Sequence, residues 1–228
     1  VDIATANAWN KGLRDSFERF PELKNNFGFV GEAHERNRML KPVVRQYYTE
    51  QFVQKYPSYD ITQQEATVNA YVKKYMKNLQ IGKNVFAVSY SPQEQELLGF
   101  RGASVNKDWG KNSEDFIEVL TYSVQNKSRP MGCETIRSVL DHEIGHQLND
   151  MLGIQGMSEV KKLFDNRTKQ ELTNDISAYT WNNNNSNKYS EMIAEAWSEY
   201  CNNPQPREIA KTIGETIEAE YAKKFGAK

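Results

Sequence analysis

The chain of 228 residues has few cysteines, few histidines and no long apolar run. Two cysteines cannot form the disulfide framework of a small secreted domain. No apolar run approaches the roughly 20 residues that a membrane-spanning helix needs, and no secretory signal is visible, so we expect a soluble chain. Because the chain starts at Val1 rather than Met, a signal peptide or an upstream domain could have been removed. The sequence therefore leaves the compartment open.

The chain also lacks an excess of charge of either sign. Its formal net charge is -1 and its pI is about 6.4. No basic stripe is visible in the sequence, which argues against nucleic acid or an anionic membrane as the main partner. The length suffices for one compact domain, or for two lobes that share a cleft.

What the chain does contain is a segment, Asp141 to Asn149, in which His142, Glu143 and His146 have the HExxH arrangement. On a helix, side chains four positions apart project from one face, so the two imidazoles can converge on one zinc ion. Glu143 would lie beside the metal, where its carboxylate can accept a proton from water. The alternative is a helix whose histidines only pack or cap, but with three histidines in the chain a chance match is rare.

A catalytic zinc takes three protein ligands and keeps one position open for water, so a third ligand is needed. His34, the remaining histidine, lies in a polar run and is best interpreted as a surface residue. Glu191 lies among apolar residues, where a carboxylate needs a partner. Glu195, one turn later, is placed to hydrogen-bond a ligand imidazole. We expect Glu199 on a solvated face and Ser190 as the helix cap.

The HExxH motif, followed after a long segment by the Glu-x-x-Ala-Glu-Ala run that starts at Glu191, resembles the anthrax-toxin lethal-factor-like metallopeptidases, a glutamate-zincin group. In that family the first glutamate of the second run is the third zinc ligand. The resemblance therefore implies one zinc ion per chain, held by His142, His146 and Glu191, and hydrolysis of peptide bonds with Glu143 as the base. It covers mainly residues 130–210.

The segment Ser177-Ala178-Tyr179 resembles the family's Ser-x-Tyr element, whose tyrosine stabilises the tetrahedral intermediate. This implies a catalytic role for Tyr179. An Asn-rich run at 181–188 lengthens the loop that follows, and Tyr189 is the alternative oxyanion donor. Where related sequences carry an aspartate three residues after the second histidine, this chain has Asn149.

A closer resemblance is carried by residues 132–148, by residues 191–200 and by the Asn-Pro-Gln-Pro segment that follows. These resemble peptidase-like domains at the ends of phage minor head proteins and related mobile-element proteins. The resemblance implies a protein or peptide substrate and a place in a larger polypeptide or in a phage or toxin assembly. The alternative is a non-catalytic structural or interaction module in which zinc only joins two helices. Glu143 favours the enzyme, since a structural site needs no base and is normally closed by a fourth ligand.

Cys133 and Cys201 each border one of the two motif helices. A bridge between them, or a thiolate at the open position of the zinc, is one interpretation. Two reduced, packed thiols are the simpler one.

Helical spacing and alternation of apolar residues predict the remaining elements. We expect helices at 4–20, 33–56, 62–79 and from residue 134 onward, and strands at 86–90, 100–105 and 116–124. This order indicates an α+β fold with a small mixed sheet, and the resemblance makes it zincin-like. A helical subdomain at 1–82 and a catalytic region at 83–228 would then enclose a cleft. The strand at 116–124 is the expected edge for an extended substrate.

Overall fold

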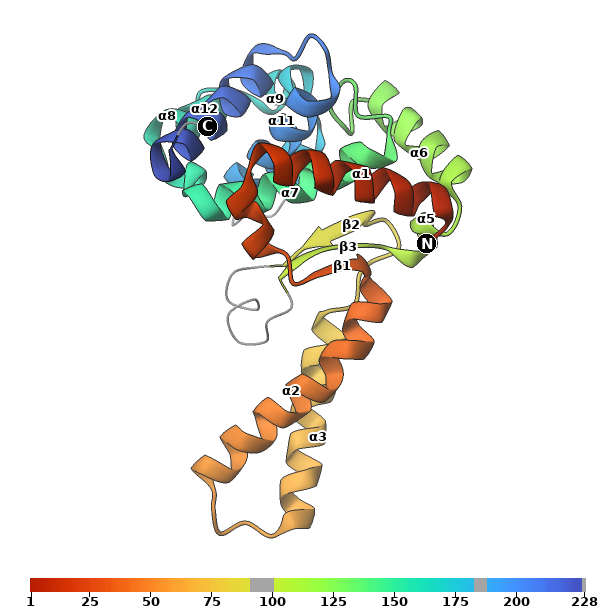
Figure 1. Cartoon of the computed structure of the whole chain (residues 1–228), viewed down its shortest axis with the longest axis vertical. Coiled ribbons are helices and arrows are strands. Elements are labelled where there is room, and N and C mark those ends of the chain that lie inside the picture. Colours follow the sequence, from red (N-terminus) through yellow and green to blue (C-terminus); the bar gives the residue numbers. More distant parts are fainter. Residues whose placement is uncertain (91–100, 183–187, 227–228) are drawn as a thin grey trace. The chain divides into compact units, whose positions relative to one another are not determined.

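The computed structural model describes residues 1–90, 101–182 and 188–226 (Figure 1). It confirms the α+β class, with many helices and, in these residues, one three-stranded mixed sheet. The chain forms two compact units, one of residues 28–107 and one of residues 1–27 together with 108–228. The units differ from the expected division at residue 82, because the N-terminal helix packs against the HExxH helix far along the chain. No helix in the described ranges is long and apolar enough to cross a membrane.

The sheet lies in the 28–107 unit. Its order is β1 (Phe29–Glu32), β3 (Gly102–Val105) and β2 (Ala87–Ser89), with β1 parallel and β2 antiparallel to β3. The strands β2 and β3 confirm two of the predicted strands, although residue 100 lies outside the described residues. The strand β1 was not predicted, since its four residues directly precede a helix and are too few to show alternation.

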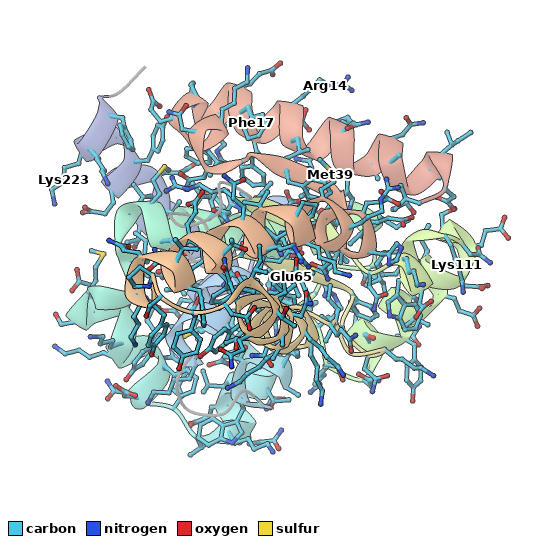
Figure 2. The ribbon with its side chains drawn as sticks, turned by 90° about the horizontal axis from the view of Figure 1, so that it is seen from below. Arg14, Phe17, Met39, Glu65, Lys111 and Lys223 are labelled. Carbon is cyan, nitrogen blue, oxygen red and sulfur yellow. The ribbon has the colours of Figure 1, made fainter. Side chains whose placement is uncertain are left out.

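Two long helices in the same unit, α2 (Ala33–Lys55) and α3 (Ile61–Asn78), form a hairpin (Figure 1). Asp60 caps the first turn of α3, because its side chain accepts a hydrogen bond from the backbone amide of Thr62. The hairpin has its own apolar core, made by Leu40, Val44, Phe52, Val68 and Val72. Figure 2 shows the side chains on these helices, with Met39 of α2 and Glu65 of α3 labelled.

The other unit is helical in the residues that are described. Its elements include α1 (Ile3–Arg19), η1 (Pro21–Asn26), α6 (Ser113–Gln125), α7 (Ile136–Leu152), η2 (Ile154–Gly156), α8 (Ser158–Asp165), α9 (Lys169–Asp175), α10 (Tyr179–Asn182), α11 (Lys188–Asn202) and α12 (Glu208–Phe225), and α5 (Lys107–Gly110) spans the junction of the units. The helices α7 and α11 pack side by side, and α1 and α12 pack on α7 (Figure 1). Buried Leu140 and Ile144 of α7 and Ile193 and Trp197 of α11 contribute to this core.

The predicted strand at 116–124 is wrong, because these residues belong to α6. Phe116 and Leu120, one helical turn apart, are both fully buried, whereas Ile117 and Tyr122 are exposed. Asn112 caps the helix by accepting hydrogen bonds from two backbone amides of its first turn. The alternation in the sequence was therefore a helical pattern with two exposed apolar residues, and no substrate-binding strand edge exists there.

Candidate metal centre

The HExxH motif lies in the middle of α7, which has well-formed ends. Thr135 caps its first turn by accepting a hydrogen bond from the backbone of Ser138, and Gly153 ends it in the left-handed conformation, with φ of 71°. A side chain at Gly145 would meet Cα of Ala194 at 2.8 Å, so this glycine permits α11 to approach the motif closely.

Three side chains from α7 and α11 converge as the sequence predicted. Nε2 of His142 and Nε2 of His146 lie 3.2 Å apart, and Oε2 of Glu191 lies 3.4 Å from the first and 3.6 Å from the second. Ligands about 2.1 Å from a tetrahedral zinc lie roughly 3.4 Å from one another. The three atoms therefore form one face of a tetrahedron of the right size. In the part of the chain that is described, this is the single group of its kind that could hold a metal ion.

Two further observations show that a cation fits this site. Oε2 of Glu191 is buried and has no hydrogen-bond donor, although a buried carboxylate oxygen needs one or a metal. Burial alone would lower the pKa of His142, but the carboxylates of Glu191 and Glu195 outweigh burial and raise this pKa to about 10. The surrounding carboxylates thus favour a positive charge between these side chains.

Glu195 orients the first ligand histidine. Its Oε1 lies 2.8 Å from Nδ1 of His142, and its Oε2 accepts a hydrogen bond of 2.6 Å from the hydroxyl of Ser177. Glu195 and Ser177 are both buried. A proton on Nδ1 that faces Glu195 leaves the lone pair of Nε2 free for a metal ion. The predicted role of Glu195 matches this geometry, and Ser177 is a partner that sequence reasoning missed.

Ser190 orients the second ligand histidine. Its hydroxyl oxygen lies 2.9 Å from Nδ1 of His146 and also accepts a hydrogen bond of 3.4 Å from the amide of Asn149. The predicted cap role of Ser190 is wrong, because α11 begins at Lys188 and Ser190 lies inside it. Asn149 thus supports the metal side of α7 through Ser190, in the place where the resemblance led us to look for an aspartate.

Glu143 is almost completely buried on α7. Burial raises its pKa above the ordinary value for glutamate, while the imidazoles of His142 and His146 act in the opposite direction. A carboxylate with a raised pKa is a better proton acceptor than an exposed one, as a general base requires.

Tyr179 begins α10, and its ring centroid lies 6.1 Å from that of His142. Burial of the hydroxyl and the charges of Glu191, Glu195 and Glu143 raise the pKa of Tyr179. The phenol therefore stays protonated near three carboxylates and can donate a hydrogen bond. The residue as a whole is 42% exposed, so it is accessible from the solvent.

Tyr189, the alternative donor, is engaged elsewhere. Its hydroxyl hydrogen-bonds the carboxylate of Asp165 at 2.8 Å, and its ring packs edge-on against Phe164. Trp181 stacks on the same phenylalanine. This arrangement ties the two ends of the Asn-rich run to α8 and leaves Tyr179 as the tyrosine beside the ligands.

The predicted solvated position of Glu199 is wrong. Its carboxylate is fully buried and forms an ion pair with Arg207, the residue that precedes α12. The guanidinium of Arg207 also donates hydrogen bonds to the backbone oxygens of Asn174 and Ile176. The pair thereby fixes the segment that leads to Ser177 and Tyr179. No local signal identified this contact, because Asn174 and Ile176 precede Arg207 by 33 and 31 residues.

The remaining predicted residues are not members of the His142, His146 and Glu191 group. His34 is exposed on α2, in the unit that does not contain the metal ligands. Both cysteines are free thiols, and Cys133 is buried with its sulfur 3.2 Å from the hydroxyl of Ser198. Burial raises the pKa of the Cys133 thiol to about 12, so it does not supply a thiolate.

No family model, curated protein or solved structure matches this chain. The interpretation of the centre therefore rests on its own geometry and chemistry.

Proposed function

We propose that the chain is a zinc-dependent metallopeptidase with a zincin-like catalytic unit. The observation that carries the proposal is the convergence of three ligand atoms from the two motif helices, at 3.2–3.6 Å from one another. Buried Glu143 lies beside them and is not one of the three ligands. The α7–α11 pair supports the resemblance to lethal-factor-like and phage-related peptidases.

A zinc ion held by His142, His146 and Glu191 would polarise the scissile carbonyl and lower the pKa of water. Glu143 accepts the proton of the attacking water and passes it to the leaving amine. Tyr179 donates a hydrogen bond to the oxygen of the tetrahedral state as charge develops there. The reaction needs no covalent intermediate with the enzyme.

The partial exposure of Tyr179 favours an enzyme over a structural zinc site, because a substrate must be able to reach the hydrogen-bond donor. A purely structural site is closed by a fourth protein ligand, and among the described residues the metal group has three members. A buried base would also have no purpose in a structural site, and burial of its charge would only destabilise the fold.

The test combines metal content with hydrolysis. Purified protein is analysed for metals by mass spectrometry and incubated with a mixed peptide library whose cleavage products are sequenced. We expect about one zinc per chain and cleavage that stops when a chelator removes the metal. Zinc without cleavage of any peptide, in the wild-type chain, would support the structural alternative.

A further inference from the structure

A basic groove runs between α2 and α3 in the 28–107 unit. Its volume is about 870 Å³, and its cationic lining residues are Arg38, Lys41 and Arg45 of α2 and Lys73 and Lys77 of α3. Residues 28–107 contain eleven Lys and Arg and seven Asp and Glu, so this unit carries +4 in a chain of net charge -1. The rest of the chain therefore carries -5, and the positive charge gathers on the hairpin unit.

Most of these cations are available to a partner. Lys41, Lys73 and Lys77 form no ion pair with the part of the chain that the structure describes, and Lys73 and Lys77 are exposed. Arg45 donates a hydrogen bond to Asn69 across the groove, and Arg38 pairs with Glu35 at the surface. Among the described residues no carboxylate lines the groove.

Part of the groove lining is apolar and is made by Pro42, Val72 and Met76, which together are called its floor. The lining residues of α3 extend from Asn69 to Lys77, which on a helix corresponds to about 12 Å. An extended peptide advances about 3.3 Å per residue, so the groove accommodates about four residues.

We propose that this groove binds an acidic peptide segment of a partner protein, with carboxylates on the lysine rows and an apolar side chain on the floor. The proposal goes beyond the peptidase function and does not depend on the chemistry at the metal centre. Nucleic acid fits less well, since none of the described residues that line the groove has an aromatic ring to stack a base, and an apolar floor does not suit phosphates. A flat membrane surface fits less well because the lysines line a concavity.

The test uses fluorescence anisotropy with a labelled ten-residue peptide that has a central leucine flanked by glutamate and aspartate. The protein carries Glu143→Gln so that the peptide is not cut. We expect saturable binding that weakens as salt is raised, because the contacts are exposed ion pairs. A peptide with glutamine and asparagine in place of the acids should not bind, and serine in place of leucine should weaken binding several-fold.

Matched variants locate the contact. Lys73→Glu with Lys77→Glu should weaken binding on the order of tenfold or more, since two attractive contacts become repulsive. The single variants Lys73→Glu and Lys74→Glu make the same charge change and are compared directly; Lys74 is the exposed neighbour of Lys73 outside the groove lining, and Lys74→Glu should change affinity less than twofold.

Three results would overturn the proposal. The first is no saturable binding of the acidic peptide, and the second is an equal loss with Lys74→Glu. The third is tighter binding of a single-stranded oligonucleotide or of phosphatidylserine vesicles than of the peptide. Because the assay measures binding without hydrolysis, its failure leaves the peptidase proposal standing, and inactivity of the metal centre leaves this proposal standing.

Discussion

The hydroxyl of Ser190 lies 2.9 Å from Nδ1 of His146, and Ser190 immediately precedes the ligand Glu191 in α11. One helix turn thus supplies a metal ligand and also the group that orients a ligand on the other helix. The metal centre depends on the register of α11 against α7 through two adjacent residues.

Ser190→Ala should weaken zinc affinity by about tenfold while the fold is kept, because His146 loses the partner that holds its ring. Titration against a chromophoric chelator measures the affinity, and circular dichroism checks the fold. Ser190→Thr keeps the hydroxyl and should restore most of the affinity. If Ser190→Ala binds zinc as tightly as the wild type, the hydroxyl has no part in orienting His146.

Glu191→Gln should remove or greatly weaken zinc binding, because the amide keeps the size of the side chain but loses the charge of the third ligand. Metal content of the purified variant gives the result. Glu215→Gln, at an exposed position on α12, is the matched control and should retain about one zinc per chain. Full zinc retention in Glu191→Gln would assign the ligand role to another carboxylate.

Glu143→Gln should keep the fold and the zinc but lower hydrolysis on the order of 10²-fold or more, since an amide cannot accept the proton of the attacking water. Cleavage rates and metal content are measured on the same sample. Unchanged turnover would falsify the base role, and equal loss of zinc and activity would make Glu143 a ligand.

Tyr179→Phe should lower kcat by roughly 10- to 10³-fold with little change in KM or zinc content, because its hydrogen bond is made in the transition state. Tyr189→Phe removes a hydroxyl that bonds Asp165 and should affect catalysis only mildly. Steady-state kinetics on a cleaved peptide compare the two variants. The reverse pattern would assign the oxyanion contact to Tyr189.

Asp2 caps α1 and also accepts a hydrogen bond from the backbone of Ser113. The hydrogen bond from Thr5 is the main cause that lowers the pKa of Asp2 from 3.8 to about 2. The folded-state pKa of Asp2 is below the unfolded one. The stability that the ionised carboxylate contributes is therefore present above about pH 4 and is lost as the pH falls through about 2. Asp2→Ala should reduce unfolding free energy at pH 7 by about 1 kcal/mol.

Urea unfolding at pH 7 and pH 3 tests the cap. Asp2→Asn keeps an acceptor for the amide of Thr5, so it should be close to wild type at pH 7 and lose less stability than wild type on acidification. Equal acid sensitivity of Asp2→Asn and wild type would show that Asp2 does not titrate as described.

The sequence predicted the long elements and the ligand set, because both are local or periodic. His142, Glu143 and His146 lie within one helix turn and a half, and the spacing of Glu191 and Glu195 places them on one face of another helix. The apolar residues of α2 and α3 repeat over enough turns to distinguish a helix from a strand, which a short apolar run does not do.

The contacts that the sequence did not reveal depend on how the helices pack against one another. The burial of Glu199 requires Arg207, and the hydroxyl of Ser190 has its role only when α7 lies beside α11. The expected absence of a basic stripe is wrong for the hairpin, because Arg38, Lys41 and Arg45 share one face of α2 and Lys73 and Lys77 share one face of α3. The helix α6 was mistaken for a strand because exposed Ile117 and Tyr122 imitate alternation.

The contact between Glu199 and Arg207 determines the shortest fragment of the chain that is expected to keep the metal centre intact. A chain cut at residue 203 would keep every ligand, the base and both tyrosines, yet it would lack the guanidinium that holds the backbone oxygens of Asn174 and Ile176. A buried carboxylate at Glu199 would then have no counter-charge, and the segment before Tyr179 would lose its anchor. The smallest fragment that keeps this anchor therefore extends past the last motif to Arg207, the residue before α12.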